Sequence, residues 1–348
     1  MKYSIIVPVY NRPDEVGELL QSLCEQTVKD FEVIIVEDGS VNPCKDVCDK
    51  YADILSLHYY AKENSGPGQS RNYGAERVNG TYVIILDSDV VLPPTYLQAV
   101  EDELTQQPCE AFGGPDAAHP DFTPVQKAIS YSMTSFFTTG GIRGGKAELD
   151  KFYPSSYNMG IRHDIYLELG GFTKMRFGED IDFSYRIVEA GYKPRLFPEA
   201  WVWHKRRTDF TKFFRQVYNS GIARINLEKR HPGTLKLVHL LPTVFTVGVF
   251  GLALLFVCGL MISSFGSATT KPQGQLCCQL ALLPLALYSL LIFIDSSIKN
   301  KSLHVGLLSI PAAFVQLTGY GLGFIESWWK RCIKGQNEFQ AFEKTFYK

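Results

Sequence analysis

Two aspartates that directly follow an apolar run are the first residues in this chain that could do chemistry. Asp87 and Asp89 come after residues 83–86, a short run that contains β-branched residues and is typical of a buried strand. Carboxylates at positions i and i+2 after a strand can converge on one divalent cation, and oxygen ligands suit Mg²⁺ or Mn²⁺ bridging substrate phosphates. Asp-Ser-Asp is also ordinary turn chemistry, so a solvated turn is the alternative for the triplet alone.

The elements that must position these aspartates alternate between strands and helices. Strands are predicted over residues 4–10, 31–36, 55–60, 82–86, 111–114 and 157–161, with helical patterns between them. This alternation predicts an α/β fold with a parallel, right-handed sheet. The carboxyl ends of parallel strands lie at one edge of a sheet, where open α/β folds bind ligands. Residues that follow different strands are therefore expected to share one site.

Several residues at the predicted strand ends have the chemistry of a nucleotide site. Asp38 could accept a hydrogen bond from an imide nitrogen of a base, and Tyr10 offers a ring on which a base could stack. Arg12 and Arg71 are cations suited to a diphosphate. A routine turn explains Asp38 and a solvated helix face explains Arg71, but their joint occurrence in this order favours a site.

Other nucleotide-handling classes fit the sequence less well. No Gly-x-Gly-x-x-Gly motif follows the first strand, which disfavours a dinucleotide dehydrogenase. A nucleotidyltransferase would need an early glycine-rich, lysine-bearing phosphate loop, and residues 11–13 are Asn-Arg-Pro instead. The formal net charge of -1 gives no basic field for nucleic acid. The eight cysteines are scattered, and no signal peptide is recognised, so a reducing compartment is expected for the polar part of the chain.

Five ordered motifs together resemble a known enzyme family. They are Ile-Ile-Val-Pro-Val-Tyr-Asn-Arg at 5–12, Val-Glu-Asp-Gly-Ser at 36–40, Asp-Ser-Asp at 87–89, Gly-Gly-Phe at 170–172 and Gly-Glu-Asp at 178–180. Across residues 3–205 the chain resembles the family 2 glycosyltransferases of the GT-A fold. The resemblance implies a nucleotide-sugar-binding, Rossmann-like mixed sheet with flanking helices. It also implies a nucleotide-sugar donor, with UDP favoured and GDP left open.

The resemblance assigns an expected role to each matching residue. The donor would be bound by Pro8, Tyr10, Asn11, Arg12, Asp38, Arg71, Asp87 and Ser88, with Asp87 on the ribose side. A divalent cation, Mn²⁺ or Mg²⁺, would be bound by Asp89 and His204, although a packed histidine beside two tryptophans is the alternative for His204. Glu179, Asn158 and Gly160 are expected on the acceptor side.

Asp180 matches the general base of the family. In an inverting transfer a carboxylate takes the proton of the acceptor hydroxyl while that oxygen attacks the anomeric carbon, and cations stabilise the leaving diphosphate. Two acids in the first turn of a helix also suit the helix dipole, so capping is the alternative. The chain lacks the Gln-x-x-Arg-Trp motif of processive synthases. It therefore resembles members that add one sugar to a lipid-linked or polysaccharide acceptor. A processive synthase and a non-catalytic membrane scaffold stay open as alternatives.

Three apolar stretches in the last third of the chain are long enough to cross a bilayer, at residues 242–263, 276–294 and 305–325. They predict a helical membrane anchor over residues 236–329, after a catalytic domain at 1–235 and before a polar tail at 330–348. Nucleotide sugars are cytoplasmic, so the catalytic domain is expected on the inner side of the plasma membrane. Three full spans would place the basic tail outside, against the positive-inside rule. The choice between two and three spans stays open.

Two further segments are candidates for contact with lipid. Residues 123–146 carry aromatic residues among serines and threonines and then two Gly-Gly pairs, which fits either a surface excursion or a mobile substrate- or membrane-facing segment. Residues 205–207 are Lys-Arg-Arg, and phenylalanines follow at 210, 213 and 214. A basic and aromatic cluster of this kind favours anionic headgroups, and a solvated helix face is the alternative.

Overall fold

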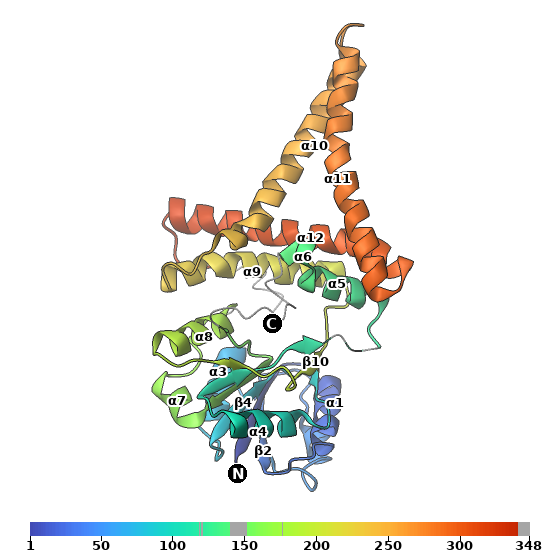
Figure 1. Ribbon diagram of the computed structural model, residues 1–348. Coiled ribbons are helices and arrows are strands. Elements are labelled where there is room, and N and C mark those ends of the chain that lie inside the picture. The colour runs from blue at the N-terminus through green and yellow to red at the C-terminus, as the bar shows by residue number, and fades with distance from the viewer. Residues whose placement is uncertain (118, 120, 140–151, 176, 340–348) are drawn as a thin grey trace. The chain divides into compact units, whose positions relative to one another are not determined.

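The computed structural model describes residues 1–117, 119, 121–139, 152–175 and 177–339. The chain forms two compact units (Figure 1). The first unit contains residues 1–120 and 146–205, and the second contains residues 121–145 and 206–341. Residues 121–139 and 206–230 fold with the apolar helices, and the boundary at residue 235 between a catalytic domain and an anchor stays a prediction.

The first unit is built on a seven-stranded mixed sheet with the order β3-β2-β1-β4-β8-β6-β9. Its strands are β1 (Tyr3–Val9), β2 (Phe31–Asp38), β3 (Leu57–Lys62), β4 (Tyr82–Leu86), β6 (Ala111–Gly113), β8 (Asn158–Arg162) and β9 (Arg195–Leu196). The strands β1 to β4 are parallel, whereas β8 runs antiparallel to both β4 and β6. The all-parallel sheet predicted from the alternation is wrong at β8, and the mixed sheet implied by the resemblance is confirmed. Parallel strands need a long crossover, but a long connection does not by itself fix the direction of the next strand, so the alternation could not predict that of β8.

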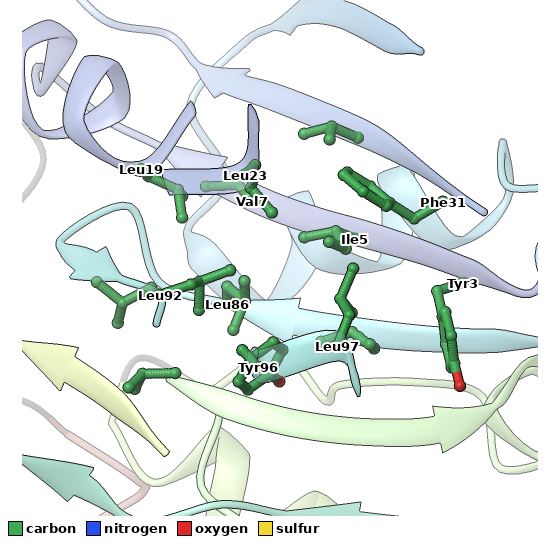
Figure 2. Packing of buried hydrophobic residues seen from close by; sticks show 14 of the residues in the cluster. Tyr3, Ile5, Val7, Leu19, Leu23, Phe31, Leu86, Leu92, Tyr96 and Leu97 are labelled. Carbon is green, nitrogen blue, oxygen red and sulfur yellow. The ribbon is translucent and has the colours of Figure 1, made fainter. Parts of the chain in front are cut away.

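Helices cover both faces of this sheet, which explains why the strands are continuously apolar. On one face, Ile5, Val7 and Ile84 pack against α1 (Pro13–Cys24) and α4 (Tyr96–Gln106), as Figure 2 shows for part of this core. On the other face, Ile6 and Ile85 pack against α3 (Pro67–Ala75), α7 (His163–Glu168) and α8 (Glu179–Glu189). Successive strand residues point to opposite faces, so one run of apolar residues serves both cores. A short helix, α2 (Lys45–Asp49), joins β2 to β3.

A second, three-stranded sheet brings residues from distant parts of the sequence together. Its order is β5-β10-β7, made of β5 (Val90–Val91), β10 (Val202–His204) and β7 (Asp116–Ala117). The central strand β10 is antiparallel to β5, and the register pairs His204 with Val90. This pairing places His204 beside the residue that directly follows Asp89.

The second unit is entirely helical in the residues that the structure describes. It contains α5 (Pro124–Thr134), α6 (Phe136–Thr139), α9 (Phe210–Arg230), η1 (Leu237–Leu240), α10 (Leu241–Phe265), α11 (Lys271–Asn300), α12 (Leu303–Trp328) and η2 (Trp329–Ile333). Three helical stretches, Leu237–Phe265, Lys271–Asn300 and Leu303–Ile333, are long and apolar enough to cross a membrane. The described part of the 123–146 segment forms α5 and α6, and α5 packs against α12. The two Gly-Gly pairs of that segment lie outside the described residues, as do positions 340–348 of the predicted polar tail.

Candidate active site

Asp87, Asp89 and His204 form a cluster at the carboxyl end of β4. One ligand atom from each lies within 4.8 Å of the other two. The strand β4 delivers the two aspartates, and β10 delivers the histidine through its pairing with β5. Two carboxylates and an imidazole are donors that Mn²⁺ accepts readily, so the residues present fit a divalent cation. The structure thus brings Asp89 together with His204, as expected for a metal pair, and adds Asp87 to them.

Charged partners surround Asp89, whose side chain is only 10% exposed. The Arg12 guanidinium donates to one carboxylate oxygen of Asp89, and His204 Nε2 lies 3.4 Å from the other. Burial opposes ionisation, but His204 and Arg12 outweigh it and hold the pKa of Asp89 well below its usual range. Burial likewise opposes the imidazolium, and the carboxylates of Asp116 and Asp89 raise the pKa of His204 to about 9. The cluster is therefore built to attract positive charge.

Arg71 connects this cluster to the start of α8. Its guanidinium, only 3% exposed, donates to Asp87 at 2.8 Å, to Glu179 at 2.9 Å and to Ser156 Oγ at 3.1 Å. The ring of Phe172 lies 5.0 Å from the same group. A planar guanidinium can bind two carboxylates in fixed directions, so Arg71 fixes the end of β4 relative to the start of α8. The solvated-helix interpretation of Arg71 is excluded by this burial.

The two acids at the start of α8 have raised pKa values. Burial and repulsion from Asp180 raise the pKa of Glu179 to about 7, against the opposing charge of Arg71. Burial also raises the pKa of Asp180, and the negative charge of Asp87 adds to this, although Arg71 acts in the opposite direction. A carboxylate whose pKa is moved toward neutrality is a better proton acceptor than an ordinary surface aspartate. Asp180 therefore has the electrostatics of a general base.

Asp38 lies at the end of β2 and organises the loop before α3. Its carboxylate accepts hydrogen bonds from the backbone N–H groups of Ser65 and Gly66, each at 2.9 Å, and from the Lys62 ammonium. Three hydrogen bonds from described residues thus engage a carboxylate that has about four acceptor positions. The position fits the expected nucleoside side, and its contacts also show a structural task in shaping this loop.

Asn11 fastens the loop after β1 to the loop after β2. Its backbone adopts a left-handed conformation, with φ of 54°, which asparagine tolerates better than most residues. Its side-chain oxygen accepts from the N–H groups of Val41 and Asn42 at 2.8 and 2.9 Å, and its own N–H donates to Ser40 Oγ at 2.7 Å. Asn11 thereby positions the flanking residues, Tyr10 and Arg12, at the sheet edge.

The remaining predicted donor residues divide between core and edge. Pro8 is buried within β1, opposite Val36 in the register, whereas Tyr10 is partly exposed just beyond that strand. Ser88 is 6% exposed between the two aspartates of the cluster. Arg12 and Ser88 therefore lie at the cluster, Tyr10 lies just beyond β1, and Pro8 lies inside the sheet.

The three residues expected on the acceptor side are each enclosed by neighbouring protein groups. The amide of Asn158 is 1% exposed, accepts from Tyr96 Oη at 2.7 Å and donates to the carbonyl of Ala200 at 2.8 Å. Gly160 lies inside β8, where any Cβ would overlap the ring of Phe112. Glu179 is 7% exposed and is bound to Arg71. Their observed contacts are those of residues that support the site.

Two residues near the site were not identified from the sequence. Asp116 Oδ2 lies 3.8 Å from His204 Nδ1, and Ser156 Oγ accepts from Arg71. Asp116 follows the strand predicted at residues 111–114, so the rule that singled out Asp87 could have found it. Ser156 has no such signal, because the turn before β8 is shaped only by its tertiary contacts.

The fold and this acidic cluster define the first unit as a GT-A-type unit. Residues 4–170 match the family described as Glycosyl transferase family 2. An uncharacterized glycosyltransferase of Haemophilus influenzae is 30% identical over 195 residues, which are 53% of this chain and 62% of that protein. The putative teichuronic acid biosynthesis glycosyltransferase TuaG of Bacillus subtilis is 33% identical over 129 residues, 36% of this chain and 51% of that protein.

A solved structure shows the same fold at low identity. It is the mannosyltransferase PcManGT from Pyrobaculum calidifontis in complex with GDP-Man and Mn²⁺, with 16% identity and a TM-score of 0.55. That match covers 95% of this chain and 88% of that one. Across the curated relatives, the match covers between 13% and 62% of the relative's own length. The chain carries a family 2 glycosyltransferase domain.

Proposed function

We propose that this chain is an inverting glycosyltransferase that moves one sugar from a nucleotide-sugar donor to a lipid-linked or polysaccharide acceptor. The observation that carries the proposal is the continuous set of charged groups from Asp89 through Asp87 and Arg71 to Asp180. This set supports the proposal because a cluster that fits a divalent cation and a carboxylate of raised pKa lie at one edge of the sheet. The donor complex of the Pyrobaculum mannosyltransferase, which has the same fold, supports a nucleotide-sugar ligand.

Each group has a defined task in this proposal. Asp89, Asp87 and His204 would hold a divalent cation, which when bound supplies positive charge to the donor diphosphate. Arg12, which donates to Asp89, would donate to the diphosphate, and Asp38 would accept from the base. Asp180 accepts the proton of the acceptor hydroxyl as that oxygen bonds to the anomeric carbon. The bond from that carbon to the diphosphate oxygen breaks, and the anomeric configuration inverts.

The apolar helices of the second unit support a membrane-bound acceptor. They provide a bilayer anchor in the same chain as the transferase domain, which suits a lipid-linked substrate. We place the catalytic unit on the cytoplasmic side, where nucleotide sugars are made. UDP-sugars are the first donors to test and GDP-sugars the second, since the Pyrobaculum structure holds GDP-Man.

The test is release of nucleoside diphosphate by the full chain in lipid nanodiscs, with a panel of UDP- and GDP-sugars and extracted acceptor lipids. We expect release from one donor, dependent on Mn²⁺ or Mg²⁺ and abolished by EDTA. Inverted product stereochemistry, read by NMR, would support the single-displacement step. Absence of release with every donor would refute the enzyme and favour a membrane scaffold with a transferase-like domain.

A further inference from the structure

The helix α12 differs from the other two candidate membrane spans in how much of it is covered by protein. Only 11% of the most apolar window is buried in each of the stretches that contain α10 and α11, as expected for helices that face lipid. In the stretch that contains α12, 44% of the window is buried. The stretch with α12 is also the least apolar, with a mean hydropathy of 1.4 against 2.5 and 2.2, yet all three are long and apolar enough to span, so the packing partners of α12 decide its place.

The helices α10 and α11 form an antiparallel hairpin with two distinct ends. Gly259 of α10 packs closely on Gly274 of α11, whereas the tilted rings of Phe245 and Tyr288 lie with their centroids 5.2 Å apart. The start of α10 and the end of α11 therefore lie at one end of the hairpin, which we call the base. From Thr246 to Phe265, α10 rises about 28 Å beyond the base at 1.5 Å per residue, close to the thickness of a hydrocarbon core.

Both ends of the central part of α12 lie at this base. A Cβ on Gly306 would overlap Ser297 near the end of α11, and one on Gly321 would lie 2.7 Å from the carbonyl oxygen of Pro242 at the start of α10. Between them, Thr246 Oγ1 donates to the carbonyl of Leu317 at 3.2 Å. The chain thus advances about 22 Å along α12 without leaving the base. A third span would instead carry Gly321 to the far end, beside Gly259.

The polar helix α9 runs alongside α12 in the same direction. The contacts advance together along both helices: Gly323 meets Tyr218, Ser327 Oγ donates to the Ile222 carbonyl at 3.3 Å, and Arg331 donates to Asn226 at 2.9 Å. Glycines at the contact let the two backbones approach closely. Figure 1 shows α9 and α12 side by side, with α10 and α11 rising from them.

The first turn of α9 is charged and open, which is incompatible with the middle of a bilayer. Phe210 packs on the cluster of Ala128, Val305 and Ala312, so α9 begins beside the first half of α12. There Asp209 and Lys212 form an ion pair at 3.4 Å with side chains 44% and 64% exposed. If α12 crossed the membrane, this exposed pair would lie in hydrocarbon, where charged side chains are costly.

We propose that, of the described helices, only α10 and α11 cross the membrane, and that α9 and α12 lie together in the headgroup layer of the same leaflet. The chain then returns to the side from which it entered. This topology places Lys236 before α10, Lys299 and Lys301 at the end of α11, and Lys330 and Arg331 after α12 all on one side. It satisfies the positive-inside rule at every basic segment, which three spans do not.

The test compares the sides of the two chain ends, so it does not depend on catalytic activity. A short split-fluorescent-protein tag is placed at Met1, at Lys348 or in the turn at residues 266–270, and each full-length chain is co-expressed with the cytosolic detector fragment. We expect fluorescence from both terminal tags and none from the turn. When the detector fragment is instead exported to the opposite side of the membrane, the turn tag should fluoresce. Alkaline carbonate extraction checks that each tagged protein remains integrated in the membrane.

Two other patterns overturn the topology, and a third reverses its orientation. If the Lys348 tag is silent in the cytosol while the Met1 tag is bright, α12 crosses and three spans are present. If all three tags are bright, α10 and α11 do not form a spanning hairpin. If both terminal tags are silent and the turn tag is bright, the hairpin stands but the proposed cytoplasmic orientation of the catalytic unit is lost.

Discussion

Replacing Arg71 by methionine tests whether this guanidinium joins the metal cluster to the general base. The methionine keeps an apolar stem of similar length, and it removes a cation that is 3% exposed and bound to Asp87 and Glu179. Removing one partner of a buried ion pair typically costs about 3–5 kcal/mol, because the other charge stays buried without compensation. For a unit of about 150–250 residues that is a fall of roughly 6–20 °C in the unfolding midpoint.

Arg77→Met is the matched control in the same region of the sequence. Arg77 is 32% exposed, pairs with the exposed Glu76 at 3.1 Å and lies over the ring of Tyr73. Such a surface pair and cation–π contact together are worth about 1 kcal/mol. Differential scanning fluorimetry of both variants in the same detergent compares the midpoints directly.

The pH dependence of turnover gives a readout that a purely structural role of Arg71 would not move. The charge of Arg71 lowers the pKa values of both Glu179 and Asp180, so removing it raises both. A general base works only when it is ionised, and a higher pKa delays ionisation to higher pH. The ascending limb of kcat/KM against pH should therefore shift to higher pH in any active Arg71→Met preparation. The role of Arg71 would be refuted if Arg71→Met had the same unfolding midpoint as Arg77→Met and its ascending pH limb did not shift.

The remaining predictions concern the cluster, the base and the sheet. Asp89→Asn should weaken Mn²⁺ binding by about 100-fold in isothermal titration calorimetry, since it removes a charged ligand, while the exposed Asp14→Asn leaves it unchanged. In the wild type, activity should be lost on acidification at a pH above the ordinary aspartate range of about 3.9, because burial raises the pKa of Asp180. Loss of activity only at or below the ordinary aspartate pKa would contradict the raised pKa of Asp180. Gly160→Ala should cost about 1–3 kcal/mol, since its Cβ would overlap Phe112. In the same melting assay Gly17→Ala should be neutral or stabilising, since a Cβ in that helix would lie 3.5 Å from Val47, at ordinary contact distance.

The sequence was most informative where one local rule decides the structure. Strands β1, β2 and β4 are short apolar runs that end in polar residues, and their predicted bounds agree with the observed ones to within a few residues. Because these strands are parallel, their carboxyl ends lie at one edge of the sheet, and Asp87 and Asp89 follow β4 at that edge as predicted. The antiparallel strand β8 could not be oriented this way, because its direction follows from the path of a long excursion.

The roles of buried polar residues were beyond local sequence rules. Asn158 and Gly160 lie in the strand predicted at 157–161, but only tertiary packing shows that Tyr96 and Ala200 engage the amide and that Phe112 fills the space above the glycine. Hydropathy likewise ranks the stretch with α12 below the stretch with α10, at 1.4 against 2.5, but both pass as candidate spans, and only the packing shows that protein covers α12.

The basic and aromatic cluster at the start of α9 shows the same limit. Phe213 is fully buried with Ile129 and Met133, so it packs inside the second unit and is not available to headgroups. Arg206 is 9% exposed, which places it at the protein interior as well. Composition identified a segment associated with the apolar helices, but it could not tell the side chains that pack inward from those that face outward.

The most direct measurement is turnover and ligand binding by Asp180→Asn in the full chain, compared with the wild type in the same nanodiscs. The substitution keeps the shape of the side chain and removes its capacity to accept a proton. We expect nucleoside diphosphate release to fall by about 100-fold or more, as for loss of a general base, while Mn²⁺-dependent binding of the nucleotide stays within a few-fold of the wild type. Retained turnover would contradict the role of Asp180, and loss of nucleotide binding together with turnover would show that Asp180 supports the donor site instead.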